Sequence, residues 1–300
     1  MKKLLLLFAL FSFAAPSLLA QGSVQTNSGA CAHSSPGSGV TCQKYFYANS
    51  TTGTCGTTTT MSYTPSSSAN AFVVFSYNFG TSSSCTNASS ATISFSDNKS
   101  DSFSTTPTTP MTIGTGTYYV WYLKSISSGV TSFTLTCSIA NACAFLSFFG
   151  IEWSGAATSG PFQLGEGDWY ANGATNLTSL TVSTGNTATS SATKNIGYKN
   201  TFSVGYFTTN ANEVSTASAP YVDLMAGVPN TNNPTNGGEN IQGYGVASGG
   251  VQSTTATWTG NDGAAGIIEV FSTTQTTPAT MMPLVFGYLL PRGPYDLEWR

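Results

Sequence analysis

Residues 132–139 read SFTLTCSI and residues 143–153 read CAFLSFFGIEW, and these two neighbouring stretches decide the fold. In the first stretch Phe133, Leu135 and Cys137 occupy odd positions, while serine and threonine occupy the even ones. A period of two residues is typical of a β-strand with one face on a core and the other in water. The second stretch is apolar at both parities, which predicts a strand in the centre of its sheet with both faces covered.

The rest of the chain repeats this pattern of short strands. Runs of β-branched and aromatic residues alternate with clusters of Gly, Ser, Thr, Asn and Pro, and none shows a sustained helical period. About twelve strands are expected, which predicts an all-β fold, an antiparallel two-sheet β-sandwich of the jelly-roll or immunoglobulin-like kind. The expected strands are 57–63, 71–79, 91–96, 117–124, 132–139, 143–153, 176–183, 201–207, 221–225, 241–246, 254–259 and 266–272.

The low content of charged residues argues against a nucleic-acid partner. Charged residues make up 7 % of the chain, with 9 Lys+Arg and 12 Asp+Glu, whereas ordinary globular proteins have roughly 25 %. Nine scattered cations cannot form the basic patch that binding to phosphates requires, so no nucleic-acid partner is expected. The aromatic content of 12 % is too high for a disordered linker.

The N-terminus has the features of an export signal. Lys2 and Lys3 precede an apolar run, 4–13, and small residues lead to an expected cleavage site after Ala20. The run is about half the length that a membrane span needs. We therefore expect a cleaved signal peptide, a secreted or cell-envelope location, and no transmembrane span in the mature chain.

The expected organisation is linear. Residues 1–20 are the signal peptide, 21–56 a Gly/Ser/Cys-rich N-terminal segment, 57–275 one β-sandwich domain, and 276–300 an apolar segment with a mixed tail. Within the last part, residues 281–290 (MMPLVFGYLL) are too short and too rich in proline for a spanning helix. An edge strand or docked segment is expected there, with a sorting tail as the alternative.

Six cysteines in an exported chain indicate disulfides. Cys137 and Cys143 flank the turn-like Ala140-Asn141 between two apolar runs, so they are predicted to pair across a hairpin. The other four are expected to fasten the N-terminal segment to the body, with their pairing open. No C-x-x-C spacing occurs, so no metal site is expected at the cysteines. The four of unknown pairing are Cys31, Cys42, Cys55 and Cys85.

Several short motifs occur in a characteristic order. They are ANAFVV (69–74), Ser-Asp-Asn (96–98), WYLK (121–124), EWSG (152–155) and a closing strand after an Ala-rich turn (264–271). From about residue 57 to 272 this order resembles a group of secreted, mostly uncharacterised bacterial β-sandwich domains. The turn usually reads Asp-x-x-Gly-Asn in that group, and here Lys-Ser-Asp stands at 99–101. The resemblance implies an exported sandwich and no agreed activity.

Carboxylates and aromatic residues offer the candidate sites. Retaining glycoside hydrolysis needs two carboxyl groups about 5–5.5 Å apart beside a sugar cleft. Glu152 ends a strand, and Glu166 and Asp168 share one face if that segment is extended. The alternative is structural, because a strand-end glutamate commonly caps backbone N–H groups of the next loop and Glu-Gly-Asp is ordinary loop composition.

Neither the single histidine nor the loop acids complete a known site. A Ser-His-Asp triad would need His33, but no G-x-S-x-G elbow occurs. Asp97, Asn98 and Asp101, or the pair at 261–262, offer oxygen ligands without the spacing of a calcium loop. Structural turns and no cofactor are therefore expected, with calcium at one of the turns as the alternative.

The predicted function is a non-catalytic binding or structural role at the cell surface. The aromatic rings of Trp153, Trp169 and Tyr170, together with Glu152, are the candidate ligand platform, with core packing as the alternative for each ring. The predicted partner is polysaccharide or other cell-surface material. The alternative is an extracellular glycoside hydrolase that uses Glu152 or the pair Glu166 and Asp168.

Overall fold

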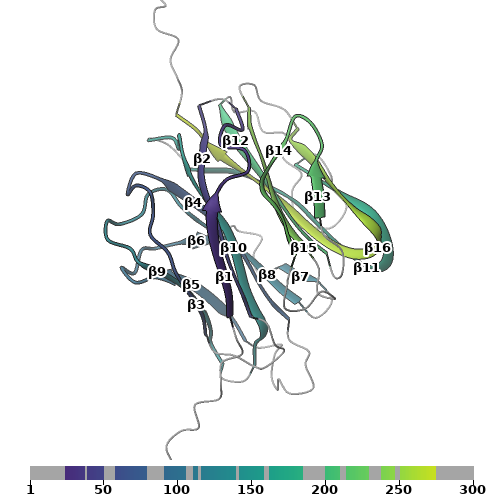
Figure 1. Cartoon of the computed structure of the whole chain (residues 1–300), viewed down its shortest axis with the longest axis horizontal. Coiled ribbons are helices and arrows are strands. Elements are labelled where there is room, and N and C mark those ends of the chain that lie inside the picture. Colours follow the sequence, from purple (N-terminus) through teal and green to yellow (C-terminus); the bar gives the residue numbers. More distant parts are fainter. Residues whose placement is uncertain are drawn as a thin grey trace, which may run out of the picture.

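The computed structural model of the chain is built from strands alone within the residues that it describes (Figure 1). These residues are 24–37, 39–50, 58–79, 91–105, 111–113, 116–139, 142–158, 162–184, 200–209, 214–229, 238–246 and 251–274. The predicted signal peptide and the C-terminal segment 276–300 lie outside them. Among the described residues no helix is long and apolar enough to cross a membrane.

The strands form three antiparallel sheets. The central sheet has the order β1-β2-β10-β4-β8-β6, with β7 also paired to β8; the six-stranded sheet has the order β11-β16-β12-β15-β14, with β13 paired to β16; and the three-stranded sheet has the order β3-β9-β5.

The strands of the central sheet are β1 (Val24–Ala30), β2 (Thr41–Ser50), β4 (Ala71–Phe79), β6 (Ser104–Thr105), β7 (Met111–Ile113), β8 (Gly116–Leu123) and β10 (Ala144–Ser154). Those of the six-stranded sheet are β11 (Gln163–Ser183), β12 (Thr201–Thr209), β13 (Val214–Ala217), β14 (Val222–Pro229), β15 (Gly238–Val246) and β16 (Ser253–Ser272). The three-stranded sheet contains β3 (Thr58–Ser62), β5 (Ile93–Asp97) and β9 (Ser132–Cys137).

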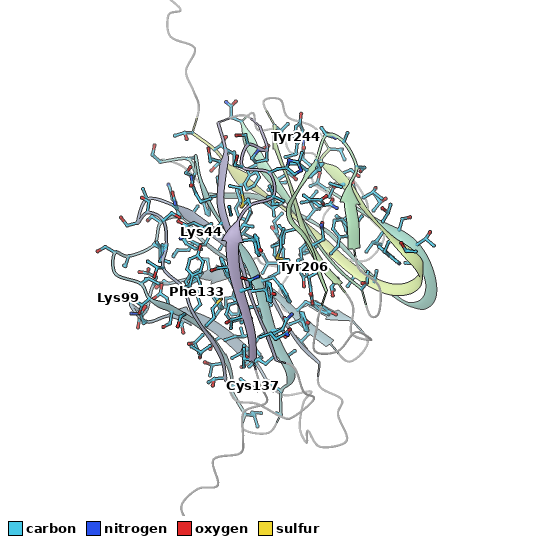
Figure 2. The ribbon with its side chains drawn as sticks, viewed as in Figure 1. Lys44, Lys99, Phe133, Cys137, Tyr206 and Tyr244 are labelled. Atoms are coloured by element: carbon cyan, nitrogen blue, oxygen red, sulfur yellow. A yellow bond between two sulfur atoms is a disulfide. The ribbon has the colours of Figure 1, made fainter. Side chains whose placement is uncertain are left out.

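The central sheet lies between the other two because both of its faces are apolar. One face packs on the six-stranded sheet in a first core that contains Phe75, Trp153 and Tyr206. The other face packs on the three-stranded sheet in a second core that contains Phe72 and Phe133. Phe133 and Tyr206 are labelled in Figure 2 and mark the second and the first core, respectively.

A third core covers the outer side of the six-stranded sheet. The strands β11 and β16 pair over almost their whole lengths, and the part of this ribbon far from the central sheet turns back over the sheet. Leu180, Val182 and Trp258 from this distal ribbon pack against Phe207 and Ile268. The molecule is therefore layered in the order three-stranded sheet, central sheet, six-stranded sheet and distal ribbon.

The strand predictions for the two deciding stretches are confirmed. In β9 half-buried and buried residues alternate, with Phe133 and Leu135 fully buried. The strand β10 lies between β2 and β4 and contributes Phe149 to the first core and Phe148 to the second. The all-β antiparallel prediction is also confirmed, although three sheets are present where two were expected. The reason is that a sheet with two apolar faces needs a covering layer on each.

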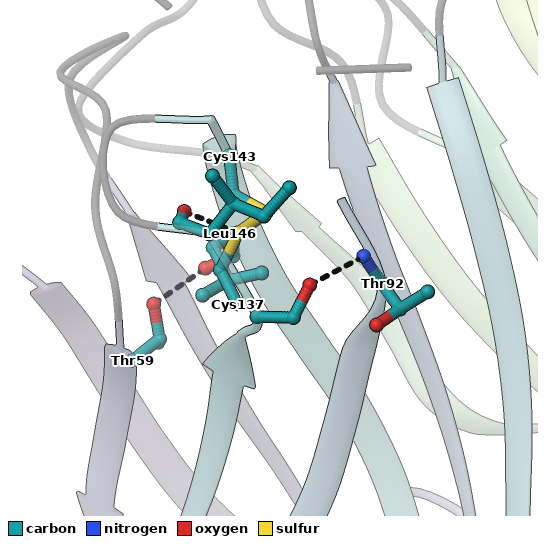
Figure 3. The surroundings of a disulfide bond; sticks show 7 residues. Thr59, Thr92, Cys137, Cys143 and Leu146 are labelled. Atoms are coloured by element: carbon teal, nitrogen blue, oxygen red, sulfur yellow. Dashed lines mark hydrogen bonds between the residues drawn. A yellow bond between two sulfur atoms is a disulfide. The ribbon is translucent and has the colours of Figure 1, made fainter. Parts of the chain in front are cut away.

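Two disulfides are described. Cys137 and Cys143 are paired as predicted, with their Cα atoms 6.1 Å apart (Figure 3). Cys31 and Cys42 form the other bond, with a Cα–Cα distance of 5.9 Å, and tie the connection between β1 and β2. The N-terminal segment thus supplies two strands to the central sheet. Cys55 and Cys85 lie outside the described residues.

Two hydrogen bonds hold the end of the three-stranded sheet beside the disulfide, one to β10 of the central sheet and one between the residues next to β5 and β9 (Figure 3). The Thr59 hydroxyl donates to the Leu146 carbonyl oxygen at 2.7 Å, and the Thr92 backbone N–H donates to the Ser138 hydroxyl at 2.9 Å. The sheet is therefore fixed to β10 of the central sheet at the same end at which the disulfide closes the hairpin.

Candidate functional site

Glu152 anchors the loop between β3 and β4. Its side chain is fully buried, and its Oε2 atom accepts a hydrogen bond from the Tyr63 hydroxyl at 2.6 Å. Its Oε1 atom accepts from the backbone N–H of Ser66 and from Nδ2 of Asn70, both at 2.6 Å, and from the backbone N–H of Ser67 at 3.3 Å. The carboxylate thus organises a loop, as the structural alternative proposed, and both of its oxygens are engaged.

The negative charge of Glu152 acts on its neighbour Tyr63. Burial together with this charge raises the pKa of the Tyr63 hydroxyl well above its ordinary value, so the hydroxyl stays a proton donor to the carboxylate. Four donors, from Tyr63, Ser66, Ser67 and Asn70, occupy the two oxygens of the Glu152 carboxylate. No face of this group is left for a substrate.

Trp153 lies in the first core, on the opposite face of β10 from Glu152. Its ring has no exposed area, stacks on Phe162 at a centroid distance of 5.8 Å and packs on Phe202 at 4.8 Å. The structure therefore does not bring Trp153 and Glu152, two of the candidate ligand-binding residues, together on one surface. Consecutive residues of a strand point to opposite faces, so these two side chains cannot line one groove.

The segment expected to form a Gly-rich loop is part of strand β11. Glu166 and Trp169 pair with residues of β16, and Glu166 is directly opposite Glu269. The side chains of Glu166, Asp168, Trp169 and Tyr170 lie outside the described part of the structure. Their roles stay predictions, but their setting is a long ribbon. Loop-like composition is overridden here because β16 supplies backbone partners along this segment, with register shifts between Gln163 and Gly165 and between Glu166 and Trp169.

The acids of the 97–101 turn bind backbone groups. Asp97 Oδ1 accepts hydrogen bonds from the backbone N–H groups of Lys99 at 2.8 Å and Asp101 at 3.2 Å. Asp101 accepts two hydrogen bonds from Ser127, from the backbone N–H and the hydroxyl, both at 2.6 Å. Asn98 Oδ1 accepts from the backbone N–H of Thr131 at 2.7 Å. These side chains act as turn-forming groups, as expected.

The other polar candidates do not gather into a site. Residues 261–262 lie within β16, in a strand and not in the turn that was expected. His33 is exposed in the connection between β1 and β2. In the described ranges no three His, Cys, Asp or Glu side chains come close enough together to hold a metal ion.

The exposed side of the three-stranded sheet carries a regular set of hydroxyl groups, which we name the first hydroxyl face. Its residues alternate with the buried residues of the second core and are all exposed or half-buried. They align across the strands in the rows Thr58–Thr136–Ser94, Thr60–Thr134–Ser96 and Ser62–Ser132.

The geometry of the first hydroxyl face follows from the sheet. Neighbouring strands place the hydroxyls about 4.8 Å apart, and alternate residues along a strand place them about 6.8 Å apart. In the middle row the Oγ1 atoms of Thr60 and Thr134 are 3.0 Å apart and share a hydrogen bond. No charged residue belongs to the first hydroxyl face, so it offers hydrogen-bond donors and acceptors and has no net charge of its own.

Glu239, a buried carboxyl group, was not identified from the sequence as a residue of interest. It is fully buried at the start of β15, and its Oε1 atom accepts a hydrogen bond from the Tyr77 hydroxyl at 3.1 Å while Oε2 has no partner. Burial raises the pKa of Glu239 to about 8, because the charged form loses its hydration there. The one signal in the sequence was that Glu239 shares parity with Ile241, which lies in the first core.

The chain has no match among protein families, and no curated protein is significantly similar to it. Among solved structures, it is similar to the extracellular domain of ANXUR2 from Arabidopsis thaliana, with 8 % identity and a TM-score of 0.24 over 84 % of this chain and 89 % of that one. It is also similar to the N-terminal CBM22-1-CBM22-2 tandem domain of Xyn10C from Paenibacillus barcinonensis, with 13 % identity and a TM-score of 0.24 over 87 % of each chain. At this TM-score neither likeness supports a conclusion about fold or function.

Proposed function

We propose that this chain is an exported, non-catalytic module that binds uncharged polysaccharide through the first hydroxyl face. The observation that carries the proposal is the row Thr60–Thr134–Ser96, with its bonded pair of threonines, in the middle of an uncharged sheet surface. The predicted signal peptide and the two disulfides support a location outside the cell.

The chemistry of the face matches a neutral polymer of sugars. Each Ser or Thr hydroxyl can both donate and accept, as sugar hydroxyls do, so many relative positions give complementary pairs. A single such hydrogen bond contributes only about 0.5–1.5 kcal/mol in water. A polymer presents its hydroxyls repeatedly and engages several rows at once, so modest contacts add up along the chain.

The hydrolase alternative lacks support at its first candidate residue. Glu152 is buried and accepts four hydrogen bonds from the protein, so it has no free position from which to protonate a glycosidic oxygen. The alternative that uses Glu166 and Asp168 stays a prediction.

The test is depletion of the purified mature chain by four insoluble uncharged polysaccharides: amorphous cellulose, xylan, mannan and starch. The double variant Thr60→Val/Thr134→Val removes two central hydroxyls while keeping side-chain shape. We expect it to weaken binding about tenfold, since two hydrogen bonds at about 1 kcal/mol or less each are lost. The matched control is Thr26→Val/Ser28→Ala on β1, where both residues are exposed.

Binding by the wild type that the control retains and the face variant loses would support the proposal. Absence of binding to all four polysaccharides, or equal binding by the face variant, would overturn it. Release of reducing sugar by the wild type would establish the hydrolase in its place.

A further inference from the structure

The order of strands in the central sheet recurs in the six-stranded sheet. The run β2-β10-β4-β8-β6 corresponds to β11-β16-β12-β15-β14, and the three-stranded sheet β3-β9-β5 corresponds to the distal ribbon with β13. The correspondence also holds along the chain. The strands β2 and β3 correspond to the two parts of β11, the strands β4, β5, β6 and β8 to β12, β13, β14 and β15, and the strands β9 and β10 to the two parts of β16.

The register agrees with this correspondence at the level of residues. Phe75 in β4 and Tyr206 in β12 occupy equivalent positions, each in the middle strand of its sheet and each facing the first core. Their rings stack on each other, 4.6 Å apart and 9° from parallel. Equivalent residues contact each other where two like units meet about a two-fold axis. The cross-strand partners are Val120 and Phe149 for Phe75, and Ile241 and Ile267 for Tyr206.

The bonded threonine pair of the first hydroxyl face has an equivalent in the other half. The Oγ1 atoms of Thr181 and Thr255 are 2.7 Å apart, and this pair spans 74 residues, as Thr60 and Thr134 do. The two strands are β11 and β16, the equivalents of β3 and β9. Both halves therefore place the same hydrogen-bonded pair at the same point of the same outer sheet.

This pair lies in a second hydroxyl face on the distal ribbon. Its rows are Ser179–Thr257, Thr181–Thr255 and Ser183–Ser253, in register across β11 and β16. All six residues are exposed or half-buried, and none is charged.

The second hydroxyl face is held in place from below. Leu180, Val182, Ala256 and Trp258 alternate with its residues and are buried in the third core. The two hydroxyl faces belong to the two outermost layers, at opposite sides of the molecule (Figure 1). Packed sheets are about 10 Å apart, so three such spacings separate the faces by about 30 Å.

We propose that the chain is an internal repeat of two equivalent β-sandwich halves, residues 41–154 and 163–272, each with one hydroxyl face that binds uncharged polysaccharide. One molecule then holds two polysaccharide chains at once and cross-links them. This inference rests on the function proposed above. We infer an uncharged polysaccharide as the partner because both faces have no ionic groups and consist of hydroxyls that can each donate and accept hydrogen bonds.

The experiment measures bridging separately from binding. Thr134 and Thr255 are equivalent residues at the centres of the two faces, so Thr134→Arg and Thr255→Arg each block one face by bulk. The readout is co-sedimentation of two differently dyed populations of particles, made from the polysaccharides of the panel that bind the wild type. The control is Thr26→Arg on β1, and circular dichroism melting verifies that each variant folds. For a variant that fails to fold, Thr134→Val or Thr255→Val takes its place.

The wild type is expected to bridge the particles. Each single variant is expected to keep about half of the binding capacity and to lose bridging, and the double variant to bind at least tenfold more weakly. If Thr255→Arg bridges like the wild type, or if Thr134→Arg alone abolishes binding, the chain is monovalent and this inference fails while the proposed function stands. If the double variant binds like the wild type, both fail.

Discussion

Replacing Glu239 by glutamine tests how the buried carboxyl couples the stability of the fold to pH. In the folded chain burial raises the pKa of Glu239 from an ordinary 4.5 to about 8. Between these two pH values the unfolded chain has lost the proton that the folded chain retains. The free energy of unfolding therefore falls as pH rises, by about 1.4 kcal/mol for each pH unit. The slope is only half as large at pH 4.5 and at pH 8, where one of the two states is half protonated, so the total fall between these pH values is about 4 kcal/mol, a large part of the stability of an ordinary domain.

Glutamine has the shape of the protonated acid and can still accept the hydrogen bond from Tyr77, but it does not titrate. We expect the free energy of unfolding of Glu239→Gln to exceed that of the wild type by about 4 kcal/mol more at pH 8 than at pH 4.5. The assay is urea unfolding followed by tryptophan fluorescence at pH 4.5, 6 and 8, with the disulfides intact. All other titrating groups are shared by the two proteins and cancel in the difference. Parallel pH profiles for the two proteins would refute the reasoning.

Three further outcomes follow from the structure. Glu152→Ala should lower the free energy of unfolding by about 3 kcal/mol in urea titrations, because Tyr63, Ser66 and Asn70 lose a buried acceptor; a loss below about 0.5 kcal/mol would contradict the anchoring role. Binding to uncharged polysaccharide should change less than about twofold between 50 and 500 mM salt, since the hydroxyl faces carry no charge, and a steep loss would indicate an ionic surface elsewhere. Peptide mapping of the unreduced chain should find Cys55 bonded to Cys85, because the other four cysteines are paired with each other. Cys55 precedes β3 and Cys85 precedes β5, and the first residues of these strands, Thr58 and Ile93, flank β9 at the same end of the sheet. Free thiols at Cys55 and Cys85 would contradict this pairing.

The strands whose burial is recorded in their own pattern of apolar and polar residues could be predicted from the sequence. The alternation in β9 and the double apolar parity of β10 report directly on how many of their faces are buried. The Cys137–Cys143 bond follows from a short hairpin between two such strands. The strand β4 also has apolar residues at both parities, and they enter the first and the second core in turn.

The other features depend on contacts between residues far apart in the sequence, and the types of the residues alone do not reveal these contacts. The first part of β11 has the glycines and acids of a loop, yet β16 supplies its backbone partners from about a hundred residues away along the sequence. A glutamate at the end of a strand can be an acid catalyst or the anchor of a loop, and the residue type does not distinguish these roles. The four hydrogen-bond donors around Glu152 show that it anchors a loop. The correspondence between the two halves lies in strand order and register, with the stacked pair Phe75 and Tyr206 at its centre.

Backbone amide chemical shifts of the isotope-labelled mature chain, titrated with soluble uncharged oligosaccharides from the same four polysaccharides, test the binding claim most directly. We predict that the shifts change along β3, β9 and β5, centred on Thr134, and along the distal ribbon, centred on Thr255. Shift changes confined to the surroundings of Glu152, Glu166 or Trp169, or no changes at either hydroxyl face at saturating oligosaccharide, would contradict the account.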